Sequence, residues 1–183
     1  MSTKNKSNWK RNLTRREIET CRKIKIKAIE KKKTQTGVST DEILQLMSGT
    51  RNFLGCFAEN DLSSIRLSSF PSFMIVNIDS SNLPGSHWLA LVIDRKSVEV
   101  FDSLGFNLFH LPRIPCHLLS FIHRLTQSRK LLVSHKLQPN KSYLCGFYSM
   151  FFVLSRQHHS FSEITKFFTN NLTRNDRRLI KLL

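Results

Sequence analysis

Long apolar runs are missing from this chain of 183 residues. No stretch approaches the roughly 20 apolar residues that a membrane-spanning helix needs. The polar N-terminus, "MSTKNKSNWKRN", also lacks the apolar segment of a signal peptide. These two absences predict a soluble protein made in a reducing compartment, without a membrane partner.

Cysteine pairs are missing as well. The four cysteines are scattered, without C-x-x-C spacing, at Cys21, Cys56, Cys116 and Cys145. This pattern argues against a disulfide framework and a zinc cage. The adjacent pairs Cys116-His117 and His158-His159 have no second matching pair, so zinc ligation is set aside. We expect neither a metal nor a small-molecule cofactor.

Acidic residues are scarce: 13 Asp and Glu stand against 29 Lys and Arg, for a net charge of +16. Residues 1–33 alone hold 13 basic and three acidic residues, which gives +10. A positive block of this kind binds nucleic acid by releasing condensed counterions. The alternatives are a solvated tail without a partner or a nuclear-import signal. We expect non-specific contact with double-stranded DNA through residues 1–33.

The chain is long enough for one folded domain with a sizeable core, and 40% of its 183 residues are hydrophobic. Thr14 and Glu17 have capping-box spacing and predict a basic helix from about 14 to 33. The segment "TQTGVS" follows as a linker. We therefore divide the chain into a basic arm with its linker, 1–37, and a compact domain, 38–183.

Three apolar runs of strand length occur at 72–79, 87–94 and 97–102. The last two form a hairpin with two apolar faces, and a sheet buried on both sides needs helices over it. Further patterns predict a strand at 130–137 and helices at 117–125, after Cys145, at 161–168 and, capped by Thr173, at 173–183. The predicted fold class is α+β, with a central mixed sheet, helices on both faces and a basic N-terminal helix in front.

His87 and Asp102 stand at the start and the end of the hairpin "HWLALVIDRKSVEVFD". If Asp94 lies opposite Ser97, Leu89 faces Asp102, and His87 lies diagonal to Asp102 on the same face. A slip of one residue would put the two on opposite faces. A carboxylate on one ring nitrogen is what a general-base histidine needs. The alternative, favoured by these two residues alone, is a strand-end histidine bound to a carbonyl and an aspartate that starts a turn.

The segment "QPNKSYLCGFYSMFFVL" supplies a nucleophile. Cys145 stands at the first turn of an apolar helix, where unpaired backbone N–H groups and the helix dipole favour a thiolate. Opposite His87, it would form a thiolate–imidazolium pair suited to acyl transfer. The Gln138 amide and the Cys145 backbone N–H could donate hydrogen bonds to an oxyanion. The alternative for Cys145 alone is a buried core cysteine.

The order His-Trp, Phe-Asp, Gln and Cys-Gly resembles the adenovirus-type cysteine proteases, the adenain family, which share a fold core with the SUMO-specific proteases. Four segments fall in the family's order at about its spacing: "RNFLGCF", "GSHWLALVIDRKSVEVFDSLGF", "QPNKSYLCGFYSMFFVL" and, more faintly, "LTRNDRRLIKLL". The resemblance covers residues 38–183 and leaves out the basic arm. It implies an adenain-like cysteine-protease fold.

Carried over by position, the resemblance implies that His87 is the general base, Cys145 the nucleophile, Asp102 the orienting carboxylate and Gln138 the oxyanion donor. Asp102 replaces the Glu that is usual in adenovirus enzymes and matches the SUMO-protease branch. In the adenovirus enzymes an activating peptide joins a cysteine eleven residues before the glutamine, and that position here is Gln127. We therefore expect DNA or a non-covalent peptide, rather than a disulfide-linked one, as activator.

The function that the resemblance implies is a cysteine endopeptidase that matures the structural proteins of a virus or a virus-like transposon. Its expected substrates are capsid or core precursors, its partner is DNA, and its location is the virion and the host nucleus. Two alternatives stay open. One is a protease for ubiquitin- or SUMO-like modifiers, and the other, outside enzymes, is a basic DNA-packaging protein with a degenerate protease domain.

Overall fold

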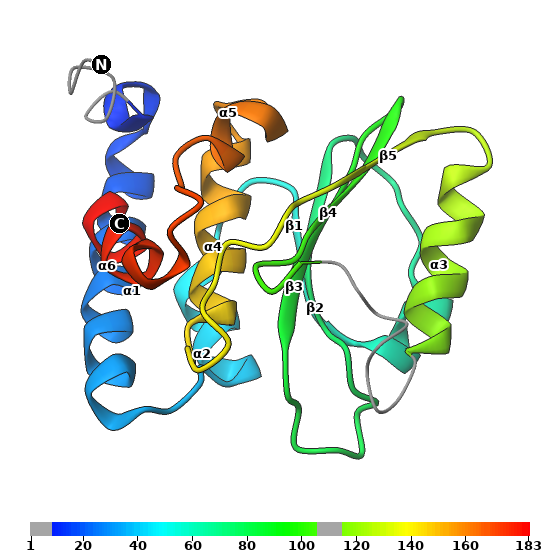
Figure 1. Ribbon diagram of the computed structural model, residues 1–183. Helices are drawn as coiled ribbons and strands as arrows, with labels where there is room; N and C mark the ends of the chain where they lie inside the picture. The colour runs from blue at the N-terminus through cyan, green and yellow to red at the C-terminus, as the bar shows by residue number, and fades with distance from the viewer. Residues whose placement is uncertain (1–8, 106–114) are drawn as a thin grey trace.

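The computed structural model describes residues 9–105 and 115–183, and its centre is a mixed sheet of five strands (Figure 1). The strands lie side by side in chain order: β1 (Phe53–Ala58), β2 (Ser72–Asn77), β3 (Trp88–Ile93), β4 (Ser97–Phe101) and β5 (Lys130–Val133). The β1–β2 and β4–β5 pairs are parallel, whereas β3 is antiparallel to both of its neighbours. The predicted mixed sheet is confirmed.

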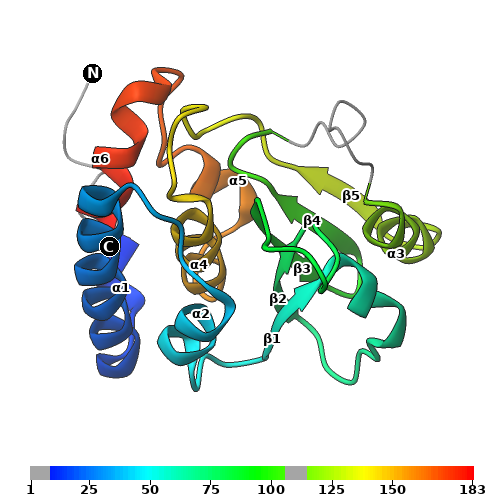
Figure 2. The same ribbon diagram turned by 90° about the horizontal axis from the view of Figure 1, so that it is seen from below.

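Helices cover both faces of the sheet. On one face, α2 (Thr40–Met47) and α4 (Cys145–Arg156) contact the strands, with α1 (Arg15–Thr34), α5 (Phe161–Thr165) and α6 (Leu172–Leu182) packed around them (Figure 1 and Figure 2). The other face is covered by α3 (Cys116–Thr126) and the 3-10 helix η3 (Glu59–Ser64), and a further 3-10 turn, η2 (Trp9–Asn12), precedes α1. The predicted α+β class is confirmed. None of the helices in the described part of the chain combines the length and the apolar character needed to cross a membrane.

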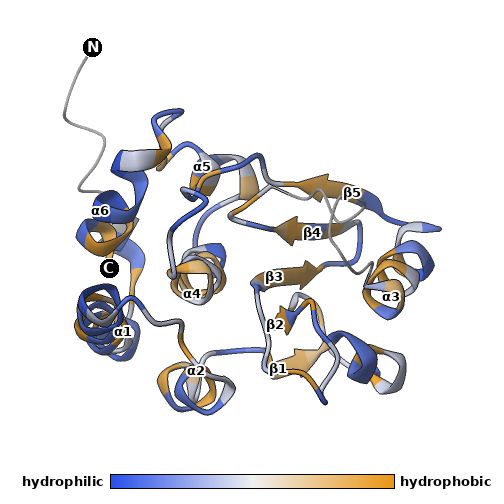
Figure 3. Ribbon diagram, turned by 60° about the horizontal axis from the view of Figure 1, so that its bottom comes forward, coloured by the Kyte–Doolittle hydropathy of each residue, from blue (hydrophilic) through white to orange (hydrophobic). Residues whose placement is uncertain are grey.

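The alternation of side chains along the β3–β4 hairpin divides the core in two. Trp88, Ala90 and Phe101 belong to the cluster on the side of α4, whereas Leu89 and Val98 belong to the cluster on the side of α3. Successive residues of a strand point to opposite faces, so an uninterrupted apolar run serves both clusters. Figure 3 shows the strands as mostly hydrophobic between the helix layers and α1 as largely hydrophilic.

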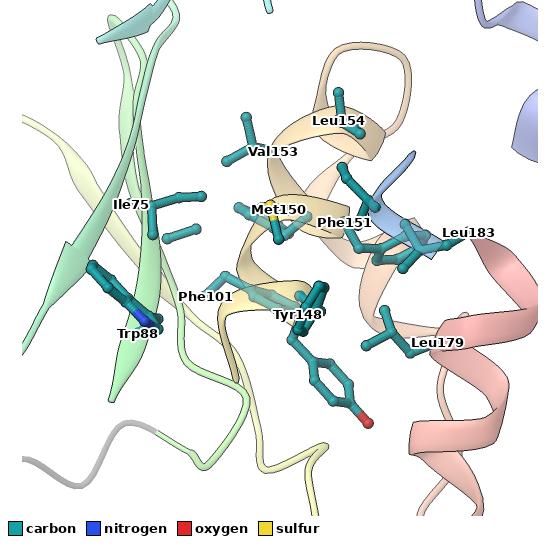
Figure 4. Packing of buried hydrophobic residues seen from close by; sticks show 14 of the residues in the cluster. Ile75, Trp88, Phe101, Tyr148, Met150, Phe151, Val153, Leu154, Leu179 and Leu183 are labelled. Carbon is teal, nitrogen blue, oxygen red and sulfur yellow. The ribbon is translucent and has the colours of Figure 1, made fainter. Parts of the chain in front are cut away.

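The helix that begins at Cys145 has no exposed side. Every residue from 145 to 155 is buried, because α4 lies between the sheet and the terminal helices. Figure 4 shows Tyr148 and Phe151 of α4 between sheet residues such as Phe101 and the C-terminal residue Leu183. The Phe101 and Phe152 rings are stacked with their centroids 4.3 Å apart. The burial of α4 therefore fixes the position of its first turn relative to the sheet.

The hairpin has the register that the sequence predicts. The Asp94 N–H donates to the Ser97 carbonyl at 2.8 Å, and Ala90 lies opposite Phe101. Continuing this pairing beyond the last ladder residues puts Asp102 on the face of the sheet that includes His87.

The first long helix is capped as predicted and packs on the rest of the fold. The Thr14 hydroxyl accepts from the Glu17 N–H, while the Glu17 carboxylate accepts from the Thr14 N–H at 2.7 Å. Cys21 and Ala28 are fully buried in the cluster that contains α4. The predicted basic helix is confirmed. The division between arm and domain stays a prediction, and residues 1–8 lie outside the described part.

Three local predictions differ from the structure. Strand β1 has no counterpart in the prediction, since Gly55, at φ +130°, and a shift in register break its pattern. The strand expected at 130–137 ends at Val133, because Ser134 turns to bind the backbone of Asp102. The N-cap position of the last helix is Asn171, whose side chain makes no capping hydrogen bond, and not Thr173, whose hydroxyl donates to the Asn171 side-chain oxygen at 2.7 Å.

Candidate active site

His87 and Asp102 meet at the end of the β3–β4 hairpin. His87 Nε2 lies 2.6 Å from Asp102 Oδ1, and both side chains are buried. The same carboxylate oxygen accepts the Leu104 N–H at 2.8 Å. His87 directly precedes β3 and Asp102 directly follows β4, so the antiparallel pairing brings the two residues together. The predicted contact is present.

Cys145 reaches the same place from a distant part of the chain. It is the first residue of α4, which packs on β3, and its side chain lies close enough to His87 to raise the pKa of the imidazole. Since His87 uses Nε2 for Asp102, its Nδ1 is the ring nitrogen left for the sulfur. The first four N–H groups of a helix have no acceptor within the helix. The sulfur therefore lies beside both an imidazole and unpaired backbone donors.

The pKa of His87 is raised from 6.5 to about 10. Burial alone would lower this pKa, because it disfavours the charged imidazolium. The interactions of the imidazolium with the Asp102 and Cys145 side chains outweigh the burial. These contacts therefore stabilise the protonated form of His87.

Gln138 lies in the segment before α4 and is held against the residue that follows Asp102. The Ser103 hydroxyl donates to Gln138 Oε1 at 2.6 Å, and the Ser103 carbonyl accepts the Gln138 backbone N–H at 2.7 Å. Gln138 Nε2 donates to the Ser142 carbonyl at 2.8 Å. Because an amide carries two N–H groups, one remains beyond the bond to Ser142. The structure thus joins Gln138 to the Asp102 segment.

Two buried residues that the sequence did not single out support this arrangement. The Ser134 hydroxyl accepts the Asp102 N–H at 2.8 Å and donates to the Asp102 carbonyl at 2.7 Å. The Asn175 side chain of α6 donates to the Leu137 carbonyl at 2.8 Å, next to Gln138. No short motif could have revealed these roles, because each contact joins segments more than 30 residues apart.

The linker after α1 forms a wall of the site. Trp88 Nε1 donates to the Val38 carbonyl at 3.0 Å. A side chain at Gly146 would place its Cβ 2.3 Å from Val38 Cγ1 and 3.1 Å from Trp88 Cδ1. The residues that follow His87 and Cys145 therefore serve packing, and this explains why a tryptophan and a glycine occupy these positions.

A groove of about 400 Å³ contains Cys145. Its walls come from Val38, Cys56 and Trp88 and from the loop before His87. Asp61 and Asp79 also line the groove, whereas none of the described lining residues is a lysine or an arginine. In a chain with a net charge of +16, the groove is therefore locally acidic, and a polyanion would bind elsewhere.

Metal ligands do not gather in the described part of the chain. Within residues 9–105 and 115–183, no group of three or more His, Cys, Asp or Glu side chains could hold a metal ion. The structure brings the predicted site residues together: His87 contacts Asp102 and Cys145, and Gln138 contacts the residue after Asp102.

The comparisons with known proteins give matches only among solved structures, since no protein-family model and no curated protein matches the chain. The ASFV pS273R protease aligns with a TM-score of 0.50 and 19% identity over 80% of this chain. This chain spans 66% of the length of that protease. The SUMO protease Ulp1, with its catalytic cysteine oxidised to a sulfinic acid, aligns with a TM-score of 0.43 and 17% identity over 92% of this chain and 94% of the Ulp1 chain in that structure. The match to the ASFV pS273R protease shows that the chain has the adenain-like cysteine-protease fold.

Proposed function

We propose that the chain is a cysteine endopeptidase in which Cys145 is the nucleophile, His87 the acid and base, Asp102 the orienting carboxylate and Gln138 an oxyanion donor. The observation that carries this proposal is the chain of contacts from Asp102 through His87 to Cys145, with 2.6 Å between the carboxylate and the imidazole. A buried thiol, imidazole and carboxylate in this order form an activated nucleophile.

In the first half of the reaction, the Cys145 thiolate attacks the carbonyl carbon of the scissile peptide bond. The negative charge moves to the carbonyl oxygen, which accepts hydrogen bonds from the Cys145 backbone N–H and from Gln138 Nε2. His87 then gives its proton to the leaving amine, and a thioester with Cys145 remains. The raised pKa of His87 keeps this proton available at neutral pH.

In the second half, water releases the acyl group. Neutral His87 takes a proton from the water, the hydroxyl attacks the thioester carbonyl, and the thiolate leaves. The acid product departs, and the imidazolium–thiolate pair is restored. Asp102 keeps Nε2 occupied throughout, so that Nδ1 faces the reacting groups.

The proposed substrates are precursors of viral or virus-like-transposon structural proteins, cleaved in the virion or the host nucleus. The fold shared with the ASFV pS273R protease supports this choice. A protease for ubiquitin- or SUMO-like modifiers is the second candidate, because Ulp1 is a SUMO protease. Modifier conjugates assayed beside Gly-containing precursor peptides distinguish the two, since each candidate cleaves only its own class.

DNA is the proposed partner of the exposed lysines of α1, with a non-covalent peptide as the other possible activator. Lys23 and Lys33 are exposed there, and neither makes an ion pair within the described residues. Lys27 and Lys31 instead pair with Glu42 of α2 at 2.9 and 3.0 Å. The outward lysines are therefore the ones available for phosphates.

A thiol-reactive probe tests the proposed nucleophile. Iodoacetamide at neutral pH should label Cys145 faster than Cys56, whose pKa burial raises to about 12, and faster than the exposed Cys116. His87→Ala should slow the labelling of Cys145 and lower kcat/KM for a cleaved peptide by about 10²–10⁴-fold. Equal labelling of the three thiols, unchanged in His87→Ala, would reject the proposal and favour a degenerate domain.

A further inference from the structure

We propose that Ser103 is a positioning residue, whose hydroxyl holds the side-chain amide of Gln138 in the orientation that presents an N–H to the oxyanion. This inference rests on the proposed function of the site. The role assigned to Ser103 follows from its buried hydrogen bond to Gln138 and from its position next to Asp102.

Ser103 binds Gln138 through both its side chain and its main chain. Its hydroxyl donates to Gln138 Oε1 at 2.6 Å, and each of the two residues is 1% exposed. The Ser103 carbonyl also accepts the N–H groups of Leu137 and Gln138, at 2.8 and 2.7 Å. Ser103 thus fixes both the backbone position of Gln138 and the direction of its side chain.

The two partners of the Gln138 amide define its orientation. The Ser142 carbonyl can only accept, so it takes an N–H of the amide, while the Ser103 hydroxyl supplies a donor to Oε1. A reversed amide would put Oε1 against the Ser142 carbonyl. Without the Ser103 hydroxyl, Oε1 would be a buried acceptor that has lost its donor, and the amide would rotate to find another.

The position of Ser103 also couples the two halves of the site. Asp102 binds His87 with its carboxylate, and the next residue, Ser103, binds Gln138. Two successive residues therefore set the spacing between the acid–base group and the oxyanion donor. Gln138 stabilises the negative charge that develops on the oxyanion. Its position therefore affects only the rates of reactions in which an oxyanion forms.

The test compares a reaction that forms an oxyanion with one that does not. Ser103→Ala should lower kcat for peptide cleavage by about tenfold to a hundredfold with little change in KM, which is less than the loss of a whole oxyanion donor. Alkylation of Cys145 by iodoacetamide displaces iodide at a saturated carbon, so its rate should match that of the wild type. The matched control is Ser155→Ala, because Ser155 is buried and its hydroxyl has no hydrogen-bond partner among the described residues. Both rates should stay at the wild-type level in this control.

A second background shows whether Ser103 acts through Gln138. In Gln138→Ala, adding Ser103→Ala should cause no further loss of kcat, since the amide that it positions is gone. If Ser103→Ala does not fold, Ser103→Cys replaces the hydroxyl with a slightly larger thiol that is a weaker donor, and it should show the same selective loss of cleavage, to a smaller degree.

Two results would overturn the role of Ser103 while the proposed function stands. One is an equal slowing of alkylation and cleavage in Ser103→Ala, which would indicate general damage to the site. The other is an undiminished loss of kcat in the Gln138→Ala background. If the wild-type chain neither cleaves peptides nor alkylates rapidly at Cys145, the proposed function itself fails, and the role of Ser103 falls with it.

Discussion

Replacing Gly146 with alanine should displace the side chains of Val38 and Trp88, which line the groove beside the nucleophile. The new Cβ would lie 2.3 Å from Val38 Cγ1, whereas ordinary contacts begin at 3.4 Å. Val38 would therefore have to move by about 1 Å to regain a normal carbon–carbon separation. Val38 is 5% exposed, and its carbonyl accepts Trp88 Nε1 at 3.0 Å, so the movement also strains that hydrogen bond.

The magnitude of the effect follows from three contributions. Overpacking in a core costs about 1–3 kcal/mol, and a weakened buried hydrogen bond adds about 0.5–1.5 kcal/mol at most. The better helix propensity of alanine offsets up to about 1 kcal/mol of this cost. We expect Gly146→Ala to lower the free energy of unfolding by about 1–3 kcal/mol, a fall in Tm of about 3–10 °C for a chain of this size.

The assay is thermal unfolding, followed together with the rate of Cys145 alkylation. Val38→Ala removes Cγ1, the atom nearest to the new methyl group, and it provides the matched background; the contact with Trp88 Cδ1 at 3.1 Å remains. There, Gly146→Ala should cost clearly less than it does alone, because the better helix propensity of alanine, worth up to about 1 kcal/mol, opposes the contact with Trp88 that remains. The reasoning is wrong if Gly146→Ala costs the same in both backgrounds, or if it stabilises the chain when introduced alone.

Two further predictions concern charge. The raised pKa of His87 predicts an alkaline limit of kcat/KM near pH 10, and Asp102→Asn should move this limit to lower pH, because a negative charge that raises the pKa is removed. The folded-state pKa lies above the ordinary 6.5, so the stability that the imidazolium contributes is complete below pH 6.5 and is lost as the pH rises toward 10. An unchanged alkaline limit in Asp102→Asn would contradict this account. For DNA, the double variant Lys23→Ala, Lys33→Ala should reduce the slope of the logarithm of the DNA-binding constant against the logarithm of the salt concentration by about 2. The control Lys96→Ala, in the turn between β3 and β4, should leave this slope nearly unchanged. A similar reduction from Lys96→Ala would mean that the contact with DNA is not specific to α1.

The part of the site that depends on local geometry could be predicted from the sequence. An even-length hairpin fixes which residues share a face, so the sequence alone implied that His87 and Asp102 could meet. The start of a helix at Cys145 followed from the apolar pattern after it. By contrast, β1 could not be predicted, because Gly55 interrupts its alternation and a parallel partner supplies the pairing.

The sequence by itself determined the strand pairing of the hairpin, the capping of α1 and the residue types available for acyl transfer, since these depend on neighbours in the chain. Only the tertiary structure decided that Cys145 contacts His87, that Ser103 holds Gln138 and that Val38 closes one wall. These contacts join segments 35 to 50 residues apart or more. Their formation depends on how α4 and the linker pack against the sheet, and packing of separate segments leaves no periodic trace in the sequence.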